Sequence, residues 1–300
     1  MLKVKRCFCA GFVAFSLSGL GFSASFASQV MDATHTSVQL PDYPKRIVTL
    51  APSLGELAAD ILGQEIHRIV GVSEYTDYPP KLRWLPSIGP YHQFNFEKVL
   101  SLRPDLVFAT LDGNSKEQVK HLRDLGISVV VVETGDFSEI AHSMQLIAKS
   151  LGNLKLGEEM ALNLTKRLQG FREKAKSHPP LKVLMQIGDS PLVVVGGHSF
   201  LSSALKTVGA RNVYEDAQAH YPRPSLEDVF QKDPDVIIIV ALGDDIAPFQ
   251  AITQKWSQFP LLKAVKNRRV HLIKSDVLLR PTLRIIEGLS LLEKTVYGKK

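Results

Sequence analysis

The chain has 300 residues, a formal net charge of +6 and two cysteines. A chain of this length suits two domains of ordinary size, each with its own hydrophobic core. Its mild charge, its single short basic segment at 266–269 and the lack of aromatic residues interleaved with basic ones argue against a nucleic-acid-binding protein.

Residues 1–27 are predicted to be a secretory signal peptide. Basic residues precede an apolar run over 7–22, which is too short for a stable membrane anchor, and small residues follow at 23–27. Cleavage after Ala27 removes both cysteines and three positive charges, so the mature chain has no thiol and its net charge falls to +3. No cysteine stands where a lipid would be attached, so we expect a soluble periplasmic protein and not a lipoprotein.

The first lobe is predicted at 45–152. Residues 28–43 before it are polar and unpatterned, which predicts a flexible lead-in. Strand and helix signals then alternate, and this alternation predicts a mostly parallel sheet covered by helices. The predicted strands are 46–52, 67–73, 105–110 and 127–133, and the predicted helices are 53–62, one that ends near 126, and 137–150. Ser53 is expected to cap the first helix, with Glu56 completing a capping box.

A long helix is predicted over 154–176. Apolar residues recur on it at three-to-four spacing, and its other faces carry charged and amide side chains. We expect the segment 153–178 to connect two lobes. The alternative is an ordinary crossover helix of the first lobe, with the linker at 177–180.

The second lobe is predicted at 179–297, and part of it repeats the first. Two segments of the chain are similar in sequence: NFEKVLSLRPDLVFA at 95–109 and SLEDVFQKDPDVIII at 225–239. In each copy an N-cap residue, Asn95 or Ser225, starts a short helix, and a proline then ends the helix before a buried strand. Further predicted elements are strands at 181–188 and 268–276 and helices at 199–208 and 281–297. The predicted fold is therefore α/β, with two lobes that each contain a mostly parallel sheet flanked by helices.

The repeat places Glu97 and Glu227 at equivalent points, in the first turn of the two short helices. If the lobes are related by pseudo-symmetry, the two carboxylates lie on the same outer surface, one on each lobe. The alternative is that each glutamate only complements the positive end of its helix dipole, which is worth roughly 0.3–1 kcal/mol.

Aromatic residues gather just past the carboxyl ends of the predicted strands, where open α/β sheets bind ligands. The loops there contain Tyr75, Tyr91, Phe94 and Tyr221, which favours a large, flat and partly apolar ligand. Asp276 and Arg280 are expected either to pair with each other or to face a polar ligand. Three loop histidines, which are either surface residues or ligands of a shared metal, are His92, His198 and His220. The chain contains neither a G-x-S-x-G elbow nor a phosphate-binding P-loop, so we expect no enzyme.

A group of motifs resembles the periplasmic binding proteins of metal-chelate importers, and within them the corrinoid-binding members. These motifs are GVSEYTDYPP at 71–80, Gly113-Asn114, Gln118-Val119, Leu125-Gly-Ile127 and Ser275-Asp276. The resemblance implies a monomer that binds cobalamin between its lobes as cargo, with no cofactor, and docks on the permease dimer of an ABC importer. The expected ligand-binding residues are Tyr75, Tyr91, His92, Phe94, Tyr221, Asp276 and Arg280. Glu97 and Glu227 match the carboxylates that meet arginines on the two permease subunits.

Several positions depart from the corrinoid-binding pattern. Tyr91 and Tyr221 stand where that group has tryptophans, and Thr110 stands where a further aromatic residue is expected. Tyrosine and histidine are both iron ligands, so a haem or ferric-siderophore carrier is the alternative. A periplasmic enzyme is a third possibility, but the sequence offers no pairing of a nucleophile with a base.

Overall fold

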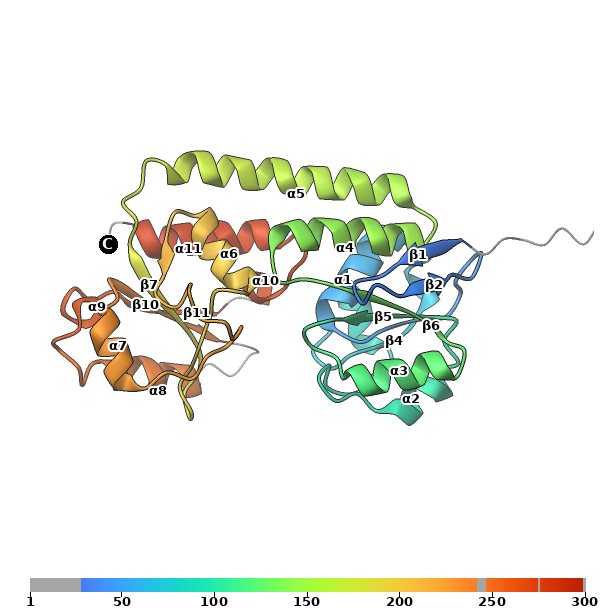
Figure 1. The fold of residues 1–300 in the computed structure, drawn as a ribbon, viewed down its shortest axis with the longest axis horizontal. Coiled ribbons are helices and arrows are strands. Elements are labelled where there is room, and N and C mark those ends of the chain that lie inside the picture. The colour runs from blue at the N-terminus through green and yellow to red at the C-terminus, as the bar shows by residue number, and fades with distance from the viewer. Residues whose placement is uncertain (1–27, 242–246, 275, 299–300) are drawn as a thin grey trace, which may run out of the picture.

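The computed structural model describes residues 28–241, 247–274 and 276–298. The predicted signal peptide lies outside these residues. The chain forms two α/β lobes side by side, bridged along one side by a layer of helices, so the predicted fold class is confirmed (Figure 1). Within the described residues no helix combines the length and the apolar character that crossing a bilayer requires.

The N-terminal lobe contains a sheet of four parallel strands in the order β4-β3-β5-β6. Its strands are β3 (Ile47–Thr49), β4 (Ile69–Val72), β5 (Leu106–Thr110) and β6 (Ser128–Val132). In β5 the side chains of Leu106 and Phe108 enter one core, and those of Val107 and Ala109 enter another. This strand is therefore covered on both faces, as its unbroken apolar sequence predicts.

The C-terminal lobe repeats this topology. Its strands are β7 (Lys182–Gly188), β8 (Val193–Val194), β9 (Arg211–Asn212), β10 (Val236–Ala241) and β11 (Val270–Lys274). Strands β9, β10 and β11 run parallel to β7 in the order β9-β7-β10-β11, which has the same connectivity as β4-β3-β5-β6. The added strand β8 pairs antiparallel with β7. The repeated sequence thus marks a repeated supersecondary unit.

One layer of helices covers a face of both sheets. It consists of α1 (Pro52–Leu62), α4 (Phe137–Ser150), α5 (Leu154–Ala175), α6 (Phe200–Thr207) and α11 (Ile285–Tyr297). Helix α5 passes over α4 of the first lobe and α11 of the second (Figure 1). Its buried side chains, including Leu164 and Leu168, belong to a single apolar cluster that contains Phe108 of one sheet and Met185 of the other. The two lobes therefore share one hydrophobic core.

The opposite face of each sheet has its own helices and its own smaller core. On the first lobe these helices are α2 (Phe96–Ser101) and α3 (Lys116–Asp124), and on the second they are α7 (Leu226–Lys232), α8 (Ala247–Trp256) and α9 (Lys263–Lys266). Three short elements complete the two lobes, namely η1 (Gly63–Arg68), η2 (Pro80–Trp84) and α10 (Asp276–Leu279).

The two copies of the repeat are anchored in the same way. The side chains of Asn95 and Ser225 accept hydrogen bonds from the third backbone N–H of their helices, at 2.9 and 3.2 Å, which confirms both N-caps. Asp105 and Asp235 immediately precede β5 and β10. Their carboxylates accept backbone N–H groups just before β3 in the first lobe and at the first residue of β7 in the second. The repeated Pro-Asp sequence therefore has a structural role in both lobes.

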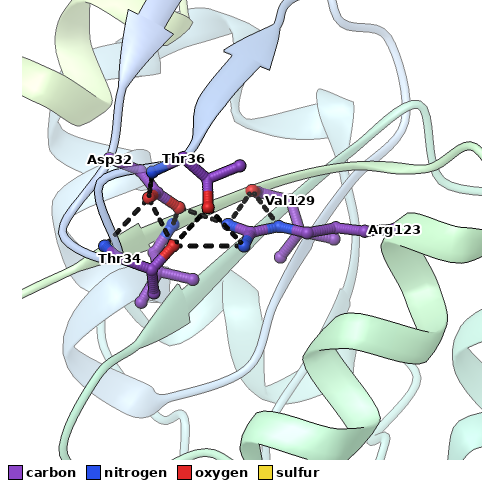
Figure 2. A network of polar contacts seen from close by, with 6 residues as sticks. Asp32, Thr34, Thr36, Arg123 and Val129 are labelled. Carbon is purple, nitrogen blue, oxygen red and sulfur yellow. Dashed lines mark hydrogen bonds and ion pairs between the residues drawn. The ribbon is translucent and has the colours of Figure 1, made fainter.

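The prediction that residues 28–43 form a flexible lead-in is wrong. The strands β1 (Gln29–Met31) and β2 (Ser37–Gln39) form an antiparallel hairpin that packs beside β6. Figure 2 shows the polar network that holds it. Buried Asp32 forms an ion pair with Arg123 of α3 and accepts hydrogen bonds from backbone N–H groups of Thr34, Thr36 and Val131, at 2.9, 3.1 and 3.0 Å. A single carboxylate therefore joins the hairpin loop to a helix and a strand of the lobe.

The predicted capping box of α1 is also wrong. The helix starts from Ala51 with Pro52 in its first turn, and no side chain caps it. Proline suits this position because the first turn leaves its N–H groups unbonded in any case. The carboxylate of Glu56 is fully buried and bonds to the other lobe instead of to its own helix start.

Candidate ligand site between the lobes

Tyr91 of the first lobe and Tyr221 of the second lie near each other across the space between the lobes. Burial raises the pKa of Tyr221 to about 12, and the neighbouring Tyr91 and Asp112 add to the rise. Because both contributors belong to the opposite lobe, the loop that precedes α7 faces the loops near α2 and β5. Tyr221 and Tyr91 remain 44% and 45% exposed, so protein surrounds the phenol rings without covering them.

The Tyr91 loop is held by residues of the Gly-Asn motif. The amide of buried Asn114 donates to the carbonyl oxygens of Tyr91 and Leu50, at 2.5 and 3.1 Å, and its oxygen accepts the N–H of Thr110 at 2.7 Å. A Cβ atom at Gly113 would lie 2.7 Å from a ring carbon of Tyr91, so only glycine lets the ring approach this closely. The motif thus fixes where the Tyr91 ring stands.

Tyr75 is the most exposed aromatic residue of the predicted site. It follows β4, adopts a left-handed backbone conformation with φ of 64°, and is 73% exposed. Its carbonyl oxygen accepts a hydrogen bond of 3.0 Å from the guanidinium of Arg280, which follows α10. The Tyr75 turn is therefore tied to the second lobe.

A buried ionic junction lies beneath this turn. The carboxylate of Glu56 accepts a hydrogen bond of 2.6 Å from Thr282 and lies 3.4 Å from Arg284 and 3.8 Å from Arg280. Burial raises the pKa of Glu56, while the Thr282 hydrogen bond and the two guanidinium charges oppose the rise. The guanidinium of Arg284 also stacks on the ring of Tyr78 at 3.8 Å. The junction joins α1 of the first lobe to the segment between α10 and α11.

Two of the predicted ligand-binding residues occupy positions that differ from the expectation. Phe94 is 2% exposed and belongs to the separate core of the first lobe, so its ring faces the core and not the space between the lobes. Arg280 forms ion pairs with Asp77 and Glu56, and no ion pair joins it to half-buried Asp276 within the described residues. The carbonyl oxygen of Phe94 accepts a hydrogen bond of 3.0 Å from the Gln118 side chain, which ties this loop to α3.

The histidines flank the facing tyrosines. The ring of His92 meets the edge of Tyr91 at 5.7 Å between centroids, and the ring of His220 meets Tyr221 at 6.5 Å. The carbonyl of His198 lies near Gly135 of the first lobe. Across residues 28–241, 247–274 and 276–298, the histidine, cysteine and acidic side chains form no group of three that would hold a metal ion.

Glu97 and Glu227 are both exposed, each in the first turn of its helix. In Figure 1 their helices, α2 and α7, lie on the side of the two lobes that faces away from α5. Each carboxylate therefore stands at the positive end of a helix dipole and open to solvent.

Sequence reasoning missed several residues that build the site. Asn114 stands in a loop just past a strand end and in the Gly-Asn motif, but the sequence analysis assigned its amide no role, although an amide at such a position is a signal for loop bridging. Asp112 carries a similar signal, because it is a polar residue two positions after the strand that ends at Thr110. The contacts of Glu56 with Thr282 and Arg284 join positions more than 220 residues apart, so no local pattern predicts them.

The chain matches known binding proteins along most of its length. A family model described as periplasmic binding protein matches residues 47–277. A vitamin B12-binding protein of Vibrio cholerae is 31% identical over 249 residues, which cover 81% of this chain and 86% of that protein. The crystal structure of the periplasmic vitamin B12-binding protein BtuF of Vibrio cholerae matches with a TM-score of 0.75 at 29% identity, over 84% of this chain and 96% of that one. The crystal structure of a periplasmic haem-binding protein from Pseudomonas aeruginosa matches with a TM-score of 0.74 at 27% identity, over 85% of this chain and 94% of that one.

Each of these relatives is named as a binding protein and none as an enzyme. The small molecule in each name is one that the protein binds and not the cofactor of a catalytic step. The resemblance stated from the sequence motifs is confirmed by these matches. The chain belongs to the periplasmic binding protein family.

Proposed function

We propose that the protein captures a corrinoid between its lobes and delivers it to an ABC-type permease. The observation that carries the proposal is the pair of half-exposed phenols, Tyr91 and Tyr221, that approach each other from opposite lobes. Together with Tyr75 they offer flat apolar area and hydroxyl groups on both sides of a large ring. The 31% identity to a protein named for vitamin B12 binding supports this ligand.

The phenol of Tyr221 supports a corrinoid ligand. A neutral phenol donates a hydrogen bond through its O–H group. Such a donor suits the amide fringe of a corrinoid. No chemical step is involved, and binding requires only that the faces of the two lobes contact the ligand.

Calorimetric titration with cyanocobalamin and haemin, side by side, tests the ligand. We expect cyanocobalamin to bind, and Tyr91→Ala and Tyr221→Ala each to weaken it about tenfold or more, since each removes a stacking ring. Tyr43→Ala is the matched control, because Tyr43 is 49% exposed but lies before β3 and stacks on Arg68. Undiminished cyanocobalamin binding by both cleft variants would contradict the assigned site.

Haem is the second candidate ligand, and the paired rings of His92 with Tyr91 and His220 with Tyr221 favour it. Both residue types ligate haem iron, and a haem-binding relative shares 27% identity. This candidate predicts a shifted Soret band on titration with haemin, and a further change of that band in His92→Ala or His220→Ala. Haemin binding without any spectral shift would remove the case for ligation.

Docking on the permease is assigned to Glu97 and Glu227. Both are exposed and equivalent in the repeat, so they suit a partner with two basic sites related by symmetry. Charge reversal at both positions is expected to abolish ligand uptake by cells while leaving ligand affinity unchanged. Glu117→Arg is the matched control, because Glu117 is also an exposed acid in the first turn of a helix. A parallel loss of ligand affinity would place the two carboxylates in the binding site instead.

The proposed site of action is the periplasm, where the protein works as a monomer after removal of residues 1–27. Mass spectrometry of the exported protein would give a mature N-terminus at Ser28 if the expected cleavage occurs. Sedimentation of the purified protein, with and without ligand, checks its oligomeric state.

A further inference from the structure

Arg280 is placed to act on the ligand site through another residue. It comes from the second lobe, just after α10, and among the residues that the structure describes the partners of its terminal nitrogens are Glu56, Asp77 and Tyr75 of the first lobe. Its guanidinium lies 2.5 Å from the carboxylate of Asp77, 3.8 Å from that of Glu56 and 3.0 Å from the carbonyl oxygen of Tyr75. Its side chain is 11% exposed, so little of it remains open to a bound molecule.

Tyr75 is a residue that needs such support. A left-handed backbone is strained for a side chain of this size, and it persists only where neighbouring contacts hold it. The residue is 73% exposed, so few side-chain contacts hold the ring, and the place from which it extends is set by the backbone turn. Within the turn the Thr76 N–H donates to the carbonyl of Ser73 at 3.2 Å. The Arg280 hydrogen bond adds a restraint from the other lobe, at Tyr75 itself.

The segment that carries Arg280 is itself held in place. Glu56 is fully buried and bonds to Thr282, two residues after Arg280, at 2.6 Å. The same carboxylate attracts Arg280 and Arg284, so the chain on both sides of Thr282 is held against α1. A buried carboxylate with partners of this kind keeps its geometry because breaking one contact leaves a buried charge unpaired.

We propose that Arg280 is a positioning residue that holds the Tyr75 turn against the second lobe, so that the Tyr75 ring is in place before the ligand arrives. The inference rests on the proposed function in one respect, the contact of Tyr75 with the ligand. It replaces the expectation that Arg280 is itself a polar ligand contact. Preorganisation of this kind raises affinity because the ordering cost of the turn has been met in the free protein.

A double-mutant cycle on cyanocobalamin affinity tests the inference. Arg280→Met keeps the length of the side chain and removes its charge and donors, and Tyr75→Ala removes the ring. We expect each single variant to weaken binding about tenfold, and the double variant to bind no more weakly than Tyr75→Ala alone. Full additivity would mean that Arg280 contacts the ligand independently, and would overturn the inference.

Hydrogen exchange in the free protein provides a readout that does not depend on the ligand. In Arg280→Met we expect the amides of 74–78 to exchange at least about tenfold faster, while those of β4 keep their protection. Unchanged exchange at 74–78 would overturn the positioning role, whatever the affinity.

Arg284→Met is the matched control, because Arg284 faces the same carboxylate from the same lobe but does not bond to Tyr75. We expect it to lower the melting temperature as Arg280→Met does, with a smaller effect on affinity. The specific role of Arg280 would be overturned if Arg284→Met weakened binding as much as Arg280→Met and if this loss also disappeared in the Tyr75→Ala background. The effect would then belong to the junction as a whole. Failure of the wild-type protein to bind cyanocobalamin would instead count against the proposed function, and the exchange measurement would still test the restraint on Tyr75.

Discussion

The fourth strand of each lobe has the same topology but a different environment. Strand β6 is buried along four of its five residues, and the hairpin β1-β2 packs beside it. Strand β11 stands at the corresponding edge, and three of its five residues are only half-buried. The hairpin is therefore an addition to one copy of a repeated unit, and it protects the sheet edge that the repeat leaves open.

The outer helices differ in a similar way. Phe96 of α2 is half-buried and stacks on His121 of α3 with 4.4 Å between ring centroids. Its counterpart in the second lobe, Leu226 of α7, is 45% exposed, and Phe230 one turn later is 37% exposed. Equivalent sequence positions thus have equivalent helices but unequal burial, since Phe96 stacks on a ring of α3 whereas Leu226 remains exposed.

The largest expected effect comes from removing the anchor of the hairpin. Asp32→Ala leaves Arg123 without its carboxylate and three backbone N–H groups without their acceptor, so we expect a loss of about 3 kcal/mol or more in unfolding free energy. Urea denaturation followed by circular dichroism measures it. Asp124→Ala, which removes the exposed partner of Lys120, is the control, with an effect within about 0.5 kcal/mol. Similar small losses in both variants would show that the hairpin adds nothing to the first lobe.

A medium effect is expected at the aspartates that immediately precede β5 and β10. Asp105 accepts two backbone N–H groups, from Lys45 and Arg46, and Asp235 accepts one, from Lys182. We expect Asp105→Ala to cost about 2 kcal/mol and Asp235→Ala about 1 kcal/mol in the same denaturation assay. The reverse order would contradict the view that the two residues have the same role with different numbers of bonds.

The smallest effects are expected at the outer helices. Phe96→Ser removes a half-buried, stacked ring and should cost about 1 kcal/mol, whereas Leu226→Ser at the equivalent exposed position should change stability by less than about 0.5 kcal/mol. Thermal denaturation of the two variants in parallel checks the difference. A larger loss in Leu226→Ser would mean that the surface around α7 is more ordered than its exposure indicates.

The sequence predicted the features that depend on local patterns. The apolar run of β5, the caps at Asn95 and Ser225 and the length of α5 follow from residue spacing, and each is found in the structure. The repeat predicted two lobes with an equivalent helix and strand in each, because a repeated helix-strand sequence implies a repeated supersecondary unit. These features require no knowledge of distant contacts.

The missed features depend on contacts between distant residues. The strands of the hairpin have three residues each, too few for a periodic signal, and Asp32 reaches a partner 91 positions away. Glu56 matched a capping pattern, but Pro52 started the helix without it and the carboxylate was free to meet Thr282. Phe94 stood in a loop with other aromatics, but its side chain turns into the core, which no sequence spacing reveals.

The shared core beneath α5 has a practical consequence for engineering. A chimera that takes one lobe from this chain and the other from a relative cuts through a single packed interior, whose side chains come from α4, α5 and α11 as well as from both sheets. Such a protein should fold only when these three helices are transplanted from one parent as a set, since mismatched volumes leave cavities or overlaps. Exchanges confined to the loops around Tyr91 and Tyr221 leave that interior intact and are the better way to alter what the protein binds.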